Sequence, residues 1–244
     1  RDGPDVLKDV SFTIEPQQKV AIVGRTGSGK SSLLIALFRI SEPRNGTIII
    51  DGVDVSKIGL TQLRSKLGII PQDPVLFTGS LRYNLDPFKA YSDDRLWEVL
   101  QAVEMRDVVE RLPGQLTSEI AEGGRNFSVG QRQLICMARA LLLDPKILLL
   151  DEATASLDSG TDQLLQKMIR KLFKDKTVLT IAHRLDTVMD SDRVLVMDGG
   201  VVSSLDTPRN SLGAKGIFYD LVYAEGEERG QELEEMMLPV EKEQ

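Results

Sequence analysis

The nine residues from Gly24 to Ser32 have the types and spacing of a phosphate-binding loop. The first eight, Gly24–Ser31, fit the pattern G-x-x-x-x-G-K-[ST], which follows a predicted strand and opens a predicted helix. Glycines let the backbone curl so that its N–H groups point at phosphate oxygens, and the helix dipole adds to that field. In this chemistry Lys30 contacts the β- and γ-phosphates and the Ser31 hydroxyl ligates Mg²⁺. The candidate nucleotide-binding residues here are Gly24, Arg25, Thr26, Gly27, Ser28, Gly29, Lys30, Ser31 and Ser32.

Two adjacent carboxylates follow the apolar run Ile147–Leu150. A buried parallel strand delivers such residues to its carboxyl end, where open α/β sheets bind ligands. There Asp151 would stay ionised and hold the metal shell. Glu152 would polarise an attacking water, a general-base role worth about 10²–10⁴-fold in rate. Together with the phosphate loop, the pair indicates nucleotide hydrolysis.

Two more polar residues follow predicted strands at the same edge. His183, the single histidine, ends the run Val178–Ala182, and Gln72 follows Leu67–Ile70. A lone histidine is most often structural, but here a neutral imidazole could donate to the γ-phosphate or orient the water. The Gln72 amide could bind Mg²⁺. The candidate catalytic residues are thus Lys30, Glu152 and His183, and the candidate metal ligands are Ser31, Gln72 and Asp151.

A second helix N-terminus suited to an anion is predicted at Ser128-Val129-Gly130-Gln131. Ser128 is a natural N-cap, and the glycines at 123 and 124 precede it. The chain has one phosphate loop, so this segment is either an ordinary capped helix or a surface that completes a nucleotide site of another domain.

Composition limits the classes of protein that fit. The chain has 244 residues, 41% of them apolar, and no apolar run approaches the ~18 residues of a membrane helix. The sequence does not open with the basic stretch and following apolar stretch of a signal peptide. Its single cysteine, Cys136, suits a reducing compartment. We therefore expect a soluble, globular, intracellular chain. Eight glutamates against Arg229 and Lys242 place −6 of the net charge of −7 in residues 224–244, so the nearly neutral remainder argues against nucleic-acid binding.

Short apolar strands alternate with amphipathic helices, which predicts an α/β domain over residues 1–223. Strands are expected at 10–14, Lys19–Val23, Thr47–Ile50 (before an Asp51-Gly52 turn), Leu67–Ile70, Ile147–Leu150, Thr177–Ala182 and Arg193–Met197. Helices are expected at Lys30–Phe38, Leu60–Lys66, Asp93–Ala102, Met105–Leu112, Val129–Leu143, Thr161–Phe173 and Gly216–Val222.

No convincing strand interrupts residues 83–143, which we interpret as a helical subdomain inserted in a core of residues 1–82 and 144–223. The acidic tail, 224–244, is predicted to be solvated and disordered. The alternative is a partly helical, regulatory tail that uses Leu233, Met236, Met237 and Leu238.

In this order the motifs resemble those of an ABC transporter ATPase domain. Residues 24–31 correspond to its Walker A motif, Gln72 to the Q-loop and residues 128–131 to the signature. Residues 147–152 correspond to the Walker B motif, Ser156-Leu157-Asp158 to the D-loop and His183 to the H-loop. The strings 23–32, 70–77, 80–87 and 127–133 are similar to the second nucleotide-binding domain of the C subfamily, the multidrug-resistance-associated type. The sequence departs from the general signature twice. Val129 stands in place of glycine, which the resemblance implies is usual for second domains of this subfamily, and Phe127 is a conservative apolar replacement for leucine.

This resemblance implies a P-loop NTPase fold, a RecA-like mixed sheet core with an antiparallel β edge and an inserted α-helical subdomain. It implies ATP and Mg²⁺ as cofactors. It also implies a head-to-tail dimer with a second nucleotide-binding domain on the same full-length chain. In that dimer the partner's nucleotide site would be completed by Ser128, Val129, Gly130 and Gln131, and Asp158 would lie at the interface. Transmembrane domains, on whose cytoplasmic side this domain would work, are the remaining partner.

The chain begins without an initiator methionine or cap, which we take as the start of an excised fragment. The family's adenine-stacking aromatic residue would fall just before Arg1. ATP hydrolysis that drives export is the leading hypothesis. The alternatives are a nucleotide sensor that gates a channel, and a soluble ABC ATPase of DNA repair or translation. The lack of a long coiled-coil insertion and the near-neutral core argue against the soluble ATPase.

Overall fold

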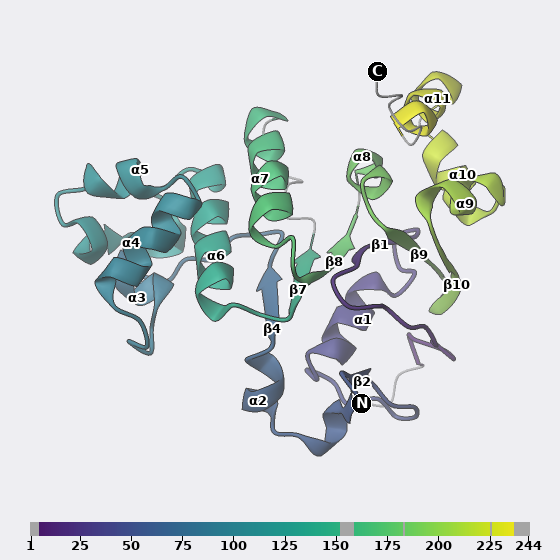
Figure 1. Cartoon of the computed structure of the whole chain (residues 1–244), viewed down its shortest axis with the longest axis horizontal. Helices are drawn as coiled ribbons and strands as arrows, with labels where there is room; N and C mark the ends of the chain where they lie inside the picture. Colours follow the sequence, from purple (N-terminus) through teal and green to yellow (C-terminus); the bar gives the residue numbers. More distant parts are fainter. Residues whose placement is uncertain (1–4, 152–158, 183, 225, 237–244) are drawn as a thin grey trace. The chain divides into compact units, whose positions relative to one another are not determined.

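A computed structural model describes residues 5–151, 159–182, 184–224 and 226–236 (Figure 1). The chain divides into two compact units, Arg1–Arg64 with Thr177–Gln244, and Ser65–Lys176. We call them unit 1 and unit 2. Throughout the described ranges, every helix is too short or too polar to cross a membrane.

Unit 1 is built on a mixed sheet. β1 (Lys19–Val23) is parallel to both β8 (Thr177–Ile181) and β9 (Arg193–Asp198), with Ala21 opposite Thr180 and Val194. β10 (Val201–Asp206) pairs antiparallel with β9, with an irregularity between Val202 and Ser204. The parallel strands are mostly buried, which explains why their sequences are continuous apolar runs. The predicted antiparallel edge is therefore present, although β10 itself was not predicted.

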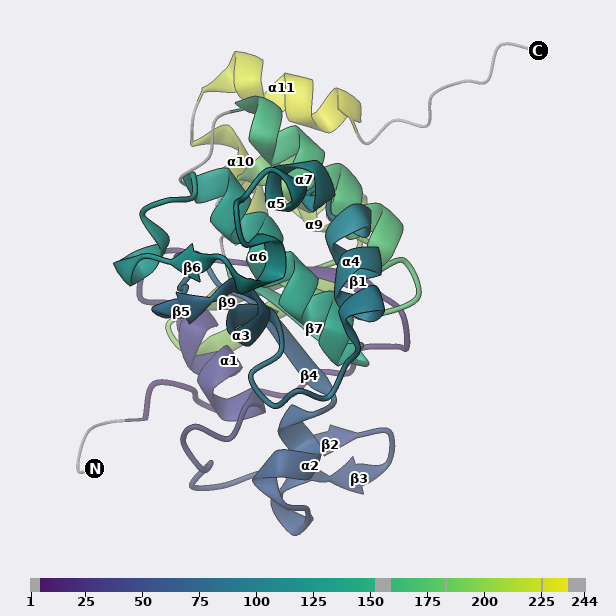
Figure 2. The same ribbon diagram turned by 90° about the vertical axis from the view of Figure 1, so that its left-hand side faces the viewer.

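Short elements surround this sheet. The hairpin predicted at Asp51-Gly52 forms between β2 (Ile49–Ile50) and β3 (Val53–Asp54), shorter than expected (Figure 2). The helices of unit 1 are α1 (Lys30–Leu37), α2 (Leu60–Arg64), α8 (Leu185–Met189), α9 (Pro208–Gly213), α10 (Ile217–Tyr223) and α11 (Glu227–Met236), with a 3-10 turn at Val55–Lys57. One apolar cluster joins β1 and β9 to α8, α9, α10 and α11.

Unit 2 contains the parallel pair β4 (Leu67–Ile70) and β7 (Ile147–Asp151), with Ile70 opposite Leu150. Its helices are α3 (Leu81–Leu85), α4 (Asp93–Ala102), α5 (Arg106–Glu110), α6 (Val129–Leu143) and α7 (Ser159–Leu172), with 3-10 turns at Gln115–Thr117 and Glu122–Gly124. The long helix α6 contacts α3, α4, α7 and β4 (Figure 1). Most of α6 is buried because it is the central helix of this unit.

Two expectations about strands were wrong. Residues 10–14 alternate between half-buried and exposed, as a strand would, but within the described part of the chain they belong to no β ladder. Alternation reports which side chains face the protein, whereas a strand also needs a backbone partner. The segment 83–143 does contain a strand, β6 (Glu119–Ile120), which pairs antiparallel with β5 (Gly79–Ser80) (Figure 2). A two-residue strand is too short to leave a periodic signal.

Residues 227–236 form a helix, as in the alternative predicted for the acidic tail. Of the four apolar residues that this alternative named, Leu233 is buried, Met236 is exposed, and Met237 and Leu238 lie outside the described residues. Leu233 is fully buried in the cluster of unit 1, and Arg229 forms ion pairs with Asp186 of α8 and with Glu232. The Tyr223 hydroxyl donates to Glu234 (2.9 Å), and this hydrogen bond is the main reason that the pKa of Tyr223 is raised. α11 is thus held against α8 and α10 by one apolar residue and several polar contacts.

Replacing Gly230 with alanine is expected to loosen α11. A Cβ at 230 would overlap with the Tyr223 ring, which is held by stacking on Tyr219 and by Glu234. Overpacking costs about 1–3 kcal/mol, while alanine gains at most ~1 kcal/mol over glycine in a helix, so we expect the opening free energy of α11 to fall by up to about 2 kcal/mol. Hydrogen exchange of the amides of residues 227–236 measures it. Gly213→Ala in α9, where a Cβ meets nothing within 4 Å, is the matched control. Equal protection in both variants would contradict the prediction.

Candidate functional site

The loop between β1 and α1 has the curled backbone that the sequence predicts. Gly24, Gly27 and Gly29 all have positive φ, and Gly29 is the left-handed residue before α1, where no side chain caps the helix. The first turn of α1 contains no acidic residue. No carboxylate in this first turn therefore competes with an anionic ligand for the helix N-terminus.

Lys30 lies over this loop. Its Nζ donates to the carbonyl oxygens of Gly24 (2.7 Å) and Arg25 (3.2 Å), and the residue is only 7% exposed. Ser28 is also buried, and its hydroxyl has no hydrogen-bond partner among the described residues. Arg25, Thr26, Gly27 and Ser31 are exposed, and Ser32 is half-buried. A buried cation and a buried hydroxyl beside the N-terminus of a helix fit a phosphate group.

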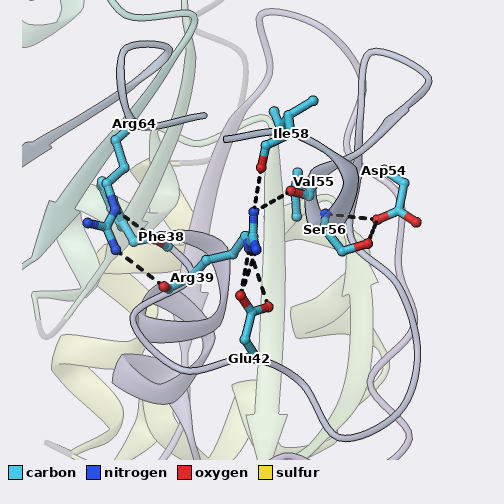
Figure 3. A network of polar contacts seen from close by, with 8 residues as sticks. All are labelled: Phe38, Arg39, Glu42, Asp54, Val55, Ser56, Ile58 and Arg64. Carbon is cyan, nitrogen blue, oxygen red and sulfur yellow. Dashed lines mark hydrogen bonds and ion pairs between the residues drawn. The ribbon is translucent and has the colours of Figure 1, made fainter. Parts of the chain in front are cut away.

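Two arginines fix the far end of α1 (Figure 3). Arg39 donates to the carbonyl oxygens of Val55 (2.7 Å) and Ile58 (2.8 Å) and pairs with Glu42 (2.6 Å), while Arg64 donates to the carbonyls of Phe38 and Arg39. The hydrogen bond from Arg39 holds the pKa of the Glu42 carboxyl below its usual value. Guanidinium groups at a helix C-terminus satisfy its last carbonyls and complement its dipole. These contacts fix the C-terminal end of α1, the helix that follows the phosphate-binding loop.

In unit 2, Asp151 ends one strand and Gln72 follows the neighbouring one. Asp151 is the last residue of β7 and is half-buried, and Gln72 follows β4 by two residues and is exposed. Because β4 and β7 are parallel and in register, both side chains lie at the carboxyl end of the same strand pair. Gln133 of α6, 1% exposed, donates to the carbonyls of Pro71 (2.9 Å) and Gln72 (3.3 Å) and fixes this loop.

The segment Ser128–Gln131 is a complete capping box. The Ser128 hydroxyl accepts from the Gln131 amide (3.2 Å), and the Gln131 side chain accepts from the Ser128 amide (3.0 Å). The predicted N-cap is therefore confirmed. Ser128 is exposed, while Val129, Gly130 and Gln131 are half-buried, and Phe127 packs inside.

The chain after Gln72 is held by a half-buried arginine that sequence inspection did not single out. Arg139 of α6 donates to Val75 O (2.7 Å), Asn84 O (2.6 Å) and Asn84 Oδ1 (2.7 Å). Asn84, 3% exposed, in turn donates to the carbonyls of Phe77 and Ser80. Burial lowers the pKa of Arg139 and raises the pKa of the Cys136 thiol beside it. Arg139 lies in none of the motifs, so no sequence signal pointed to it.

Within unit 1 the predicted phosphate-loop residues lie together, and within unit 2 Gln72 and Asp151 lie at the same end of one strand pair. Glu152, Asp158 and His183 lie outside the described residues. Their roles stay predictions from the sequence.

The family described as ABC transporter matches residues 7–155, more than half of the chain. The chain belongs to the ABC transporter family. Its fold, a mixed α/β sheet behind a phosphate-binding loop, is that of the family's nucleotide-binding domain. A bacterial Atm1-family ABC exporter, solved with ATP bound, superposes with a TM-score of 0.84 at 35% identity, over 91% of this chain and 39% of that one.

Relatives in the C subfamily share about half of the residues of this ABC domain. ABC transporter C family member 3 of Dictyostelium discoideum is 54% identical over 85% of this chain and 15% of its own length. The human ATP-binding cassette sub-family C member 4 is 53% identical over 90% of this chain and 17% of its own length. The expected subfamily is confirmed, and the chain spans about a sixth of the length of these relatives.

Proposed function

We propose that this ABC domain binds Mg-ATP and hydrolyses it to power export by a larger membrane transporter. The observation that carries the proposal is the loop 24–32, where Lys30 and the buried hydroxyl of Ser28 lie at the N-terminus of α1. Membership of the ABC transporter family and the ATP-bound relative support ATP as the ligand.

Mg²⁺ would be held by Ser31, Gln72 and Asp151. Hydroxyl, amide and carboxylate oxygens are the hard ligands that Mg²⁺ binds, and it takes further oxygens from the phosphates and water. Asp151 at the end of β7 and exposed Gln72 after β4 offer such oxygens from one strand pair. Bound Mg²⁺ would neutralise charge on the phosphates. Lys30 would bind the phosphate oxygens, Glu152 would take the proton of the attacking water and His183 would orient it.

The domain would work as one half of a pair. We infer that it closes head to tail on a second nucleotide-binding domain of the same full-length protein, itself being the second of the two. Exposed Ser128 and the start of α6 would then face the partner's nucleotide, and Asp158 would lie at the interface. Closure of this pair, at the cytoplasmic face of the membrane, would drive the conformational change of the transmembrane domains. The C-subfamily relatives, about six times longer than the matched region, support this arrangement.

Glu152→Gln is the test of hydrolysis. The change keeps the size of the side chain but removes the general base, so we expect Mg-ATP affinity within about twofold of wild type and turnover lower by about 10²–10⁴-fold. Steady-state hydrolysis should be measured over a range of protein concentrations. The wild-type rate should rise more steeply than linearly if the site is completed across a dimer.

Three results would count against the proposal. Undiminished turnover in Glu152→Gln would exclude the assigned base. Turnover per molecule that is independent of protein concentration would exclude completion across a dimer. Bound Mg-ATP with no wild-type turnover, also in the intact protein, would favour the nucleotide sensor.

A further inference from the structure

The turn between β9 and β10 is bonded to the phosphate-binding loop. The amide of Gly200 donates to the carbonyl of Ser28 (3.0 Å), and the carbonyl of Gly200 accepts from the amide of Lys8 (2.8 Å). A single residue of the turn therefore connects the loop with the N-terminal segment through backbone hydrogen bonds. Because these are backbone bonds, no motif in the sequence reveals them.

The approach at Gly200 leaves no room for a side chain. Its φ is +90°, and a Cβ there would overlap with the carbonyl of Val6 and lie 3.7 Å from the Cα of Leu7. A side chain must therefore displace the N-terminal segment or pull the turn away from Ser28. The preceding residue, Gly199, also has positive φ (+52°), but a Cβ there meets nothing within 4 Å.

The end of β9 and the N-terminal segment touch the same loop at other points. A Cβ at Gly24 would overlap with the carbonyl of Met197. A Cβ at Gly29 would lie 3.0 Å from Leu7 Cδ2, 3.4 Å from Met197 Cε and 3.6 Å from the Cα of Gly200. The loop is thus enclosed on this side at Gly24, Ser28 and Gly29, and a shift of the turn must be felt by the loop.

We propose that Gly200 is a positioning residue of the nucleotide site. By holding the carbonyl of Ser28 on one side and the amide of Lys8 on the other, it fixes the curvature in which the loop directs its N–H groups at phosphate. This proposal rests on the proposed function, because that function assigns Mg-ATP to the loop. Gly200 acts through Ser28, so its replacement changes nucleotide affinity through the shape of the loop.

Gly200→Ala and Gly199→Ala form a matched pair for the test. Both add one methyl group to adjacent turn residues with positive φ, but only position 200 is crowded. Mg-ATP is titrated into the 244-residue chain by calorimetry. We expect Gly200→Ala to bind at least about 10-fold more weakly than wild type, or about 1.4 kcal/mol, and Gly199→Ala to bind within about twofold. Equal affinities, or an equal loss in both variants, would overturn the proposal.

Urea unfolding of each variant with and without Mg-ATP separates positioning from stability. A purely structural role lowers the stability of the free protein but leaves the gain from Mg-ATP unchanged, whereas a positioning role reduces that gain. An unchanged gain in Gly200→Ala would overturn the proposal. If the wild-type chain shows no gain and no heat of binding, the assignment of Mg-ATP itself fails.

A second pair of variants tests the other hydrogen bond should Gly200→Ala not fold. Lys8→Pro removes the amide that donates to Gly200, while Lys8→Ala keeps it. The Lys8 side chain is exposed, so alanine should bind Mg-ATP as wild type does. Proline should weaken Mg-ATP binding at least about threefold beyond alanine. Equal affinities in the two variants would overturn the proposal.

Discussion

Lys30→Met should weaken Mg-ATP binding by at least about 100-fold and remove measurable hydrolysis. The Nζ of Lys30 donates to Gly24 O and Arg25 O, so the ammonium lies on the inner side of the loop, in a residue that is 7% exposed. A charge-assisted hydrogen bond from such a partly buried cation contributes about 1.5–3 kcal/mol, which corresponds to one to two powers of ten in affinity. Loss of its charge near several phosphate oxygens adds to this.

The measurement is a calorimetric titration of Mg-ATP with a charge-matched control. Lys57→Met also removes one positive charge from unit 1, but its side chain is 78% exposed and 3.6 Å from Asp54. This control should bind Mg-ATP as wild type does and lose at most about 0.5 kcal/mol of stability. An affinity of Lys30→Met within about threefold of wild type would contradict the assignment of this loop as the phosphate site.

The sequence predicts best what depends on neighbouring residues. The curl of the phosphate loop follows from its own glycines, and the capping box at Ser128 needs only Gln131 three residues later. The buried strands β1, β4, β7 and β8 also follow from local apolar runs. In each case the residues that make the structure are close together in the chain, so their types and spacing suffice.

Groups that hold the site in place were missed because their partners are distant in sequence. Gln133 contacts a carbonyl 62 residues away, and Arg139 one that is 55 residues away. Their acceptors are backbone oxygens, which every residue possesses, so the pairing leaves no mark on residue type. The error at 10–14 has the same origin: alternating burial is local, but the backbone partner that defines a strand is not.

The tail illustrates a third limit. Its composition, eight glutamates with few apolar residues, favours a solvated chain. One buried leucine, Leu233, together with Arg229 and the close approach of Gly230 to Tyr223, is nevertheless enough to dock α11. Average hydropathy cannot report a contact made by one residue at the right place.

Arg139→Met should lower the free energy of unfolding of unit 2 by about 3–4 kcal/mol. The side chain makes three short hydrogen bonds to Val75 and Asn84, and its loss leaves the carbonyl and amide oxygens of the buried Asn84 with fewer donors. An unsatisfied buried acceptor costs about 1–3 kcal/mol, which places this change among the severe point mutations. Arg139 holds the residues that follow Gln72, so its replacement should also make the position of Gln72 less well defined.

Urea denaturation and hydrogen exchange of residues 75–85 measure this effect. Arg139→Lys keeps the charge, but lysine lacks the planar guanidinium group that donates to three acceptors at once. This variant should therefore lose only about half of the stability that Arg139→Met loses. Arg95→Met in α4 is the control, because its ion pair with Glu98 is largely exposed and should contribute at most about 0.5 kcal/mol. If Arg139→Met and Arg95→Met lose the same stability, Arg139 is a surface-like cation and another group must hold the chain after Gln72. If Arg139→Lys matches wild type, charge alone fixes this segment, and the forked hydrogen bonds contribute little.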